Sequence, residues 1–255
     1  DEEFRLDPRD SALIAQAQKK DTVPTWEFGV SAGHIFAIGN VDYLPGVAGG
    51  VHFRRALDYV FSLRVDAMYG KIRGEDVGNI RNFRNDWLSA SALGMISLNN
   101  LNWEEKIRKT NLYAMGGLGV NYFQVDVGEK DSPNRTVDGK VSWHAEFGAG
   151  ISFRLAEKIN FGIEHKVLTA FGERSDLIDG FKTSIAVSDP ADEGRRTFTD
   201  FMHYSNIRIN VNISKPPAPE EPKYWINPMQ DVYADIDSIK SIIAQLEDGD
   251  GDGVV

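Results

Sequence analysis

The sequence predicts an all-β fold, an eight-stranded antiparallel up-and-down transmembrane β-barrel over residues 25–213, followed by a short C-terminal periplasmic helix. Two observations predict it. Apolar and polar residues alternate along eight segments, each close to the roughly 9–11 residues that a tilted strand needs to cross a bilayer. The longest runs without charge, residues 87–103 and 110–125, are interrupted by Ser, Asn and Gly, so they are too polar for a spanning helix.

Composition restricts the class of protein further. The chain has 255 residues, 42% of them hydrophobic, and a formal net charge of −10. An acidic chain lacks the basic surface that nucleic-acid phosphates require, so we expect no nucleic-acid partner. There is no Cys, which excludes disulfides and thiolate metal sites. The chain opens at Asp1 without a cationic and apolar leader, as a mature chain would after removal of a signal peptide, and we assign residues 1–24 to the periplasm.

The strands are expected in eight segments. They cover residues 26–33, 46–54, 59–70, 87–98, 112–123, 141–154, 159–167 and 201–213. The last is the clearest, because Ile207 and Ile209 alternate with Arg208 and Asn210. The second, fourth and fifth are less regular, since Gly, Ala and Ser blur the alternation. One face of each strand suits lipid and the other suits a polar interior.

The links between the segments fall into two kinds. Residues 55–58 and 155–158 are tight turns and residues 99–109 a longer link, whereas residues 73–85, 126–140 and 172–200 are long, polar and contain Gly. Long loops on one side and short turns on the other are typical of outer-membrane barrels, whose long loops are extracellular. An even number of strands returns both termini to the periplasm.

The polar faces place acids and bases inside the barrel in nearly equal numbers. An eight-stranded barrel is only wide enough to be filled by side chains, so charges there must pair. We therefore expect a closed lumen held by structural ion pairs. The residues expected in them are Glu27, Arg54, Arg64, Asp66, Glu146, Arg154, Glu164, Lys166 and Arg208.

Alternative functions remain open at this point. A narrow or gated path for small solutes or ions could follow the same charged side chains. Glu146 and Glu164 could be a glycosidase-like carboxylate pair, but nothing places them around a substrate cleft. The five His residues lack metal-ligand spacing, and the sequence has neither a phosphate-binding loop nor a nucleophile motif. We expect a protein that is not an enzyme and a barrel without a cofactor.

Aromatic residues near the segment ends are expected to form girdles at the lipid–water interfaces. They are Trp26, Tyr59, Tyr69, Trp87, Tyr122 and Trp143. A soluble lipid-binding barrel would instead turn its apolar face inward, and the ionisable residues of the opposite face argue against that arrangement.

The tail changes character after the last strand. Residues 214–223 form a Pro-rich, extended linker, and residues 224–247 an amphipathic helix. Its apolar positions are Met229, Val232, Tyr233, Ile236, Ile239, Ile242, Ile243 and Leu246. They pack either on the chain's own domains or on a partner protein. Residues 248–255 begin an Asp-Gly repeat in which Asp248, Asp250 and Asp252 present carboxylates to calcium, with further ligands expected beyond Val255.

The whole pattern resembles the outer membrane protein A family in the form found in Bacteroidota. The resemblance consists of the barrel, the Pro-rich linker and the Asp-Gly run at residues 248–253. The resemblance implies an outer-membrane protein whose barrel contacts membrane lipid and whose tail leads to a peptidoglycan-binding domain that this sequence lacks. It further implies partners among other outer-membrane or periplasmic proteins of an envelope complex. We therefore expect a structural anchor or assembly subunit, with a small-solute or ion pore as the alternative.

Overall fold

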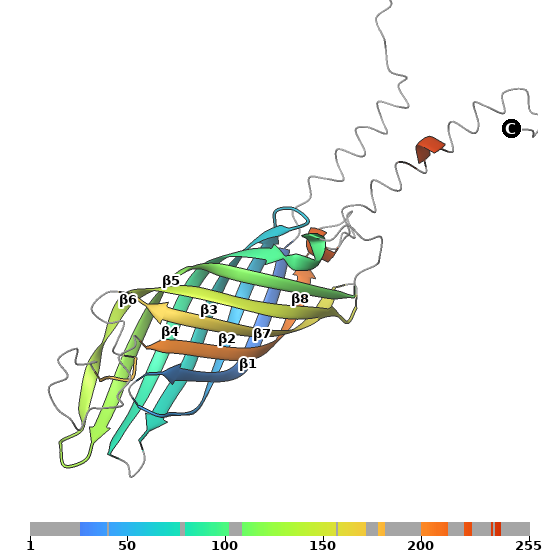
Figure 1. Ribbon diagram of the computed structural model, residues 1–255. Coiled ribbons are helices and arrows are strands. Elements are labelled where there is room, and N and C mark those ends of the chain that lie inside the picture. Colours follow the sequence, from blue (N-terminus) through green and yellow to red (C-terminus); the bar gives the residue numbers. More distant parts are fainter. Residues whose placement is uncertain are drawn as a thin grey trace, which may run out of the picture.

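The computed structural model describes residues 26–39, 41–76, 80–101, 109–156, 158–171, 178–181, 200–213, 222–225, 236 and 238–240. Its eight strands pair in chain order, and β8 pairs with β1 to close a barrel (Figure 1). The strands are β1 Trp26–Ile38, β2 Tyr43–Ala56, β3 Phe61–Glu75, β4 Arg81–Ser97, β5 Thr110–Glu129, β6 Arg135–Arg154, β7 Ile159–Ala170 and β8 Phe201–Ile213. The predicted eight-stranded antiparallel barrel is therefore confirmed. Among the described residues, no helix is long and apolar enough to span a bilayer.

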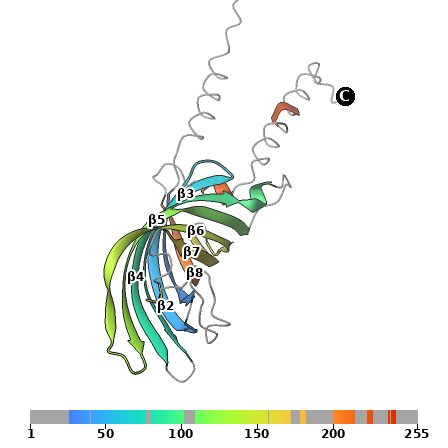
Figure 2. The same ribbon diagram turned by 60° about the vertical axis from the view of Figure 1, so that its left-hand side comes forward.

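The register of the strands fixes the shape of the barrel. Following the paired residues around the sheet from Trp26 leads back to β1 at Phe36, ten residues farther on. Such a stagger tilts the strands by roughly 40° to the barrel axis, as their slant across Figure 2 illustrates. A barrel of eight strands has room inside for side chains alone, so the lumen is a packed core.

Several strands are longer than predicted, and two predicted loops are largely wrong. Residues 73–85 and 126–140 belong mostly to strands, and the connections shrink to residues 76–80 and 130–134. The prediction required apolar residues on the outer face, but that face carries exposed charges such as Arg73 and Arg84 near the strand ends. The strands from β3 to β6 therefore project beyond the apolar part of the wall (Figure 1).

The tight turns lie at the end of the barrel that also holds Trp26 and Ile213, which we call the terminal end. The turn at residues 155–158 is confirmed, and Leu155 donates its backbone N–H to Ile159 across it at 3.0 Å. The first turn covers residues 57–60 rather than 55–58. There an Asp58 carboxylate oxygen accepts the N–H groups of Val60 and Phe61 at 2.7 and 2.6 Å, which holds Tyr59 in the turn. The link after β4 contains the short 3₁₀ helix η1, Leu98–Leu101.

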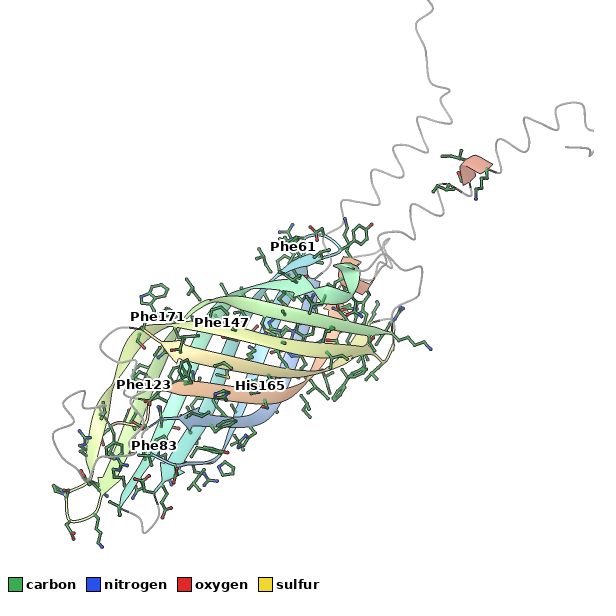
Figure 3. All side chains as sticks on the ribbon, viewed as in Figure 1. Phe61, Phe83, Phe123, Phe147, His165 and Phe171 are labelled. Carbon is green, nitrogen blue, oxygen red and sulfur yellow. The ribbon has the colours of Figure 1, made fainter. Side chains whose placement is uncertain are left out.

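The wall of the barrel is apolar on its outer face and largely polar on its inner face, the reverse of a soluble protein; we call this reversed polarity. Outward-facing side chains along the middle of the strands are apolar and exposed, and Phe147 stands away from the wall while Phe123 points inward (Figure 3). Most buried side chains in the terminal half of the lumen are polar or charged. The exposed apolar residues include Val30, Val51, Phe53, Leu63, Val65, Leu88, Leu118, Val120, Ile163, Ile207, Ile209 and Val211.

The aromatic girdles are present in part. Trp26 at the terminal end is 41% exposed, and toward the opposite end Tyr69, Tyr122 and Trp143 are 48%, 43% and 64% exposed. The assignment of Trp87 to a girdle is wrong, because Trp87 is fully buried in the lumen and stacks on Phe123. Small residues such as Ala and Ser blur the alternation after Trp87, so the sequence placed it on the wrong face, whereas the register of β4 places it inside.

The tail differs from the prediction where it meets the barrel. Lys223–Trp225 form a 3₁₀ turn, η3, and Tyr224 and Trp225 are buried against Ala56 at the terminal end. They therefore pack with the barrel instead of beginning the amphipathic helix predicted from residue 224. Residues 236 and 238–240 are helical, and Ile236 and Ile239 are exposed. The other predicted helix positions, the calcium-type Asp residues 248, 250 and 252, and residues 1–24 lie outside the described residues.

Candidate functional site

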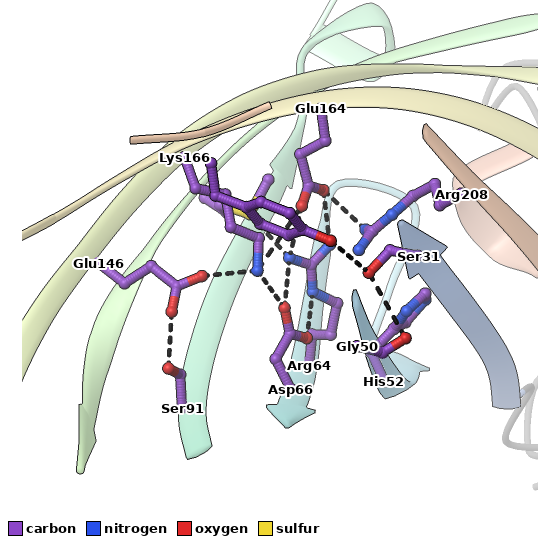
Figure 4. A network of polar contacts seen from close by, with 12 residues as sticks. Ser31, Gly50, His52, Arg64, Asp66, Ser91, Glu146, Glu164, Lys166 and Arg208 are labelled. Atoms are coloured by element: carbon purple, nitrogen blue, oxygen red, sulfur yellow. Dashed lines mark hydrogen bonds and ion pairs between the residues drawn. The ribbon is translucent and has the colours of Figure 1, made fainter. Parts of the chain in front are cut away.

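A network of charges fills the middle of the lumen (Figure 4). Its acids are Asp66, Glu146 and Glu164, and its bases are Arg64, Lys166 and Arg208, all of them buried. They come from β3, β6, β7 and β8, where inward positions recur at every second residue. Three negative and three positive groups leave the network without net charge.

Glu164 on β7 is the centre of this network. Both of its oxygens accept hydrogen bonds from the Arg64 guanidinium, at 2.8 and 3.1 Å. The same carboxylate accepts from Arg208 at 2.6 Å and from the Tyr113 hydroxyl at 2.9 Å. A Cβ at Gly150 would lie only 2.5 Å from that hydroxyl, so glycine makes room for the Tyr113 ring. One acid on β7 thus holds two cations and one phenol that come from three other strands.

Lys166 joins the remaining acids. Its ammonium group is 2.6 Å from Glu146 and also contacts Asp66, which forms an ion pair with Arg64 at 2.7 Å. The other oxygen of Glu146 accepts the Ser91 hydroxyl at 2.6 Å. The network therefore crosses the lumen from β4 to β8, and each charge meets at least one opposite charge, as buried charges require.

A second group of contacts closes the terminal end. The Tyr224 hydroxyl donates to Glu27 at 2.6 Å, and its ring lies 3.6 Å below the guanidinium carbon of Arg54. Burial raises the pKa of Tyr224 well above its ordinary value, so this hydroxyl stays protonated as a donor. Asn160 also donates to Glu27, at 3.4 Å. Tyr224 thus ties the tail to an acid of β1 and a base of β2.

The opposite end, which we call the loop end, is filled by apolar side chains and by residues 178–181. Ile178 and Phe181 are buried in a cluster with lumen residues of the strands, among them Trp87. The Asp200 carboxylate accepts the N–H of Ile178 at 2.9 Å, and the Asn85 amide donates to the Ile178 carbonyl at 2.7 Å. This segment therefore closes the lumen at the loop end.

Asp200→Ala should open the loop end. The carboxylate of Asp200 accepts the N–H groups of Ile178 and Asp179, and the substitution removes both hydrogen bonds. Each hydrogen bond to a charged acceptor contributes roughly 1.5–3 kcal/mol. The probe is Met202→Cys, which introduces the chain's only thiol at a fully buried lumen position. We expect a small water-soluble thiol reagent to label it at least about tenfold faster once Asp200 is removed. Glu129→Ala, an exposed change at the same end, is the control, and an equal rate in both variants would contradict the closure.

The structure places the predicted lumen residues as follows. Glu27, Arg54, Arg64, Asp66, Glu146, Glu164, Lys166 and Arg208 are all buried inside the barrel. Arg154 differs, because it is the last residue of β6 and only half-buried, at the terminal end. Tyr113 and Tyr224 were not predicted as partners of these charges. Tyr113 follows the inward alternation of β5 and could have been found, whereas Tyr224 lies outside every strand.

The glycosidase-like interpretation is not supported by this geometry. Glu146 and Glu164 both contact Lys166 inside the packed lumen, at 2.6 and 3.7 Å. A cleft of about 400 Å³ at the loop end is lined by neither acid and includes Arg73, Arg84 and Asp126. Within the part of the chain that the structure describes, no group of three or more His, Cys, Asp or Glu residues could hold a metal ion.

Comparison with known proteins gives similarities of fold. No protein-family model matches the chain, and no curated protein sequence matches it. Neisserial surface protein A is similar at 11% identity, covering 73% of this chain and 96% of that chain, with a TM-score of 0.46. A major outer membrane protein from Thermus thermophilus is similar at 13% identity, covering 74% and 99%, with a TM-score of 0.45. The outer membrane enzyme PagL is similar at 13% identity, covering 72% and 98%, with a TM-score of 0.36.

Proposed function

We propose that this chain is a bacterial outer-membrane barrel with a structural role, which anchors its tail at the membrane. In this proposal the loop end is extracellular and the terminal end faces the periplasm. The tail connects the barrel to the cell wall or to other proteins of an envelope assembly, and its Asp-Gly repeat binds calcium. Lipid surrounds the apolar band of the wall.

The observation that carries the proposal is the reversed polarity of the wall. In water, a continuous band of exposed residues such as Leu63, Val65 and Ile207 would be costly, and monomeric soluble proteins rarely expose large apolar patches. In a bilayer the same band is favourable, because lipid replaces water around it. Closure of the sheet gives every strand two neighbours and leaves no free sheet edge, which hydrocarbon requires.

The filled lumen supports anchoring rather than passage of solutes. Residues 178–181 occupy the loop end, paired charges cross the middle, and Tyr224 and Trp225 occupy the terminal end. The contacts of Tyr224 with Glu27 and Arg54 also give the tail a fixed attachment at the barrel. A force on the tail would therefore be transmitted to the barrel through the buried contacts of Tyr224 and Trp225.

A charge in the apolar band tests the membrane location. Val65→Lys places an ammonium group at a position of β3 that is 58% exposed, and we expect it to destabilise the barrel in lipid vesicles by about 2–4 kcal/mol. Gln124→Lys, an outward position of β5 beyond the apolar band, should cost little. Urea titration of the vesicle-inserted protein measures both changes. Equal costs, or a stable monomer in water without detergent, would contradict the proposal.

The pore alternative is tested by conductance. We expect the folded 255-residue chain to give no steady current in planar lipid bilayers, because three separate groups of side chains occupy its lumen. Steady conductance that changes with Glu164→Ala or Arg208→Ala would favour a pore and contradict a sealed anchor.

A further inference from the structure

Four polar side chains stand on the outer face of the wall where β7, β8 and β1 meet. They are His34, His165, His203 and Ser205, which we call the histidine patch. The register brings them together, because Ser205 pairs with His34 on one side and with His165 on the other. Figure 3 labels His165 on this part of the wall. The inward-facing neighbours of these residues belong to the lumen.

Apolar residues flank the patch along the strands. Along β8 the outward positions on either side of it are Phe201 and Ile207. Along β7 they are Ile163 and Val167, which enclose His165. On the proposed membrane location, His165 therefore faces hydrocarbon, and His34 and His203 lie between it and the girdle at the loop end. Polar side chains that face lipid are rare and mark functional contacts.

Contacts within the patch satisfy only part of its hydrogen-bonding capacity. Ser205 Oγ is 2.7 Å from His165 Nδ1, and His165 Nε2 is 3.3 Å from His203 Nδ1. The His203 ring stacks on Phe36, with 4.9 Å between ring centroids. Among the described residues, no hydrogen bond reaches His203 Nε2 or either ring nitrogen of His34. Lipid tails offer neither donor nor acceptor, so these nitrogens need another hydrogen-bond partner.

We propose that the histidine patch is the contact surface between two copies of this chain in the membrane. A second copy inserted in the same direction carries the same patch at the same depth, so a two-fold axis along the membrane normal brings the two together. A neutral imidazole has one donor and one acceptor nitrogen, which makes the patch complementary to itself. A different protein would have to place matching polar groups at this depth. The inference rests on the proposed membrane location of the barrel.

Cysteine crosslinking in native membranes tests the contact, and the absence of Cys from the chain makes every engineered thiol unique. Ala32→Cys places a thiol on the outer face of β1, next to His34. Ala92→Cys places one on the outer face of β4, across the barrel. We expect oxidation to give a crosslinked dimer from Ala32→Cys and none from Ala92→Cys. Equal crosslinking at both positions, a monomer at both, or a crosslink to a different protein would overturn the proposal.

A second variant separates loss of the contact from loss of the fold. His34→Leu, His165→Leu and His203→Leu combined make the patch apolar, which lipid tolerates, so the barrel should still insert. We expect the Ala32→Cys crosslink to disappear in this background while the folded barrel still resists denaturation by detergent without heating. A persistent crosslink would overturn the histidine contact. A chain that stays soluble without detergent would instead overturn the membrane location itself.

Discussion

Replacing Glu164 by Leu is expected to lower the free energy of unfolding by about 3–5 kcal/mol, the usual cost of removing one partner from a buried ion pair. The variant leaves Arg64 and Arg208 without the carboxylate that they share, and the Tyr113 hydroxyl without its acceptor. Both cations then stay in a lumen with one positive charge in excess. Urea titration of the barrel in lipid vesicles, followed by tryptophan fluorescence, measures the loss.

Two further variants identify the cause of this loss. Glu75→Gln removes an acid from the exposed end of β3 and should change the free energy of unfolding by less than about 0.5 kcal/mol. Combining Glu164→Leu with Arg208→Leu restores the charge balance of the lumen, and we expect it to recover part of the stability. If the double variant instead lost about as much stability again as Glu164→Leu alone, the network would not stabilise the barrel through its balance of charges.

Tyr224→Ala is expected to destabilise the barrel by roughly 3–5 kcal/mol, the range for truncating a buried aromatic residue. The substitution removes the hydroxyl that donates to Glu27 and the ring beneath Arg54, so a buried acid and a buried base each lose a contact. Tyr224→Phe keeps the ring and removes only the hydroxyl, and should cost about 1–3 kcal/mol.

Tyr224 lies in the tail, yet we expect it to contribute to the stability of the barrel. Residues 222–225 follow the last strand, and a tail that served only as a tether would leave the barrel's stability unchanged when altered. Urea titrations of Tyr224→Ala, Tyr224→Phe and the unaltered full chain therefore decide the matter. Equal unfolding midpoints for all three would show that η3 does not belong to the barrel's folded unit.

The strands and the faces of the barrel could be predicted from the sequence, because strand geometry alternates side chains between two sides. Where this alternation was clearest, around Arg208 on β8, both the span and the inward residues were predicted. Where small residues blurred it, as around Trp87, the face was predicted wrongly. Strand ends beyond the apolar band were also missed, since the alternation there no longer separates apolar from polar residues.

The partners of each charge could not be predicted. Arg64 and Glu164 are 100 residues apart in the chain, and only the register of eight strands brings them to 2.8 Å. The same holds for Tyr224, which is 197 residues from Glu27 and lies in no strand pattern. For residues 178–181 the sequence predicted only part of a long loop, because insertion into the lumen depends on the space left at the loop end.

The sequence by itself determined that the wall is apolar outside and charged inside, because that property belongs to each strand separately and follows from a period of two residues. The tertiary structure alone decided which charges pair, that both ends of the lumen are closed, and that three histidines gather on one outer face. The pairing of charges and the gathering of histidines depend on the stagger of ten residues that closes the sheet, which aligns residues from strands far apart in the chain. The closure of the two ends depends on segments outside the strands that fill the space left there.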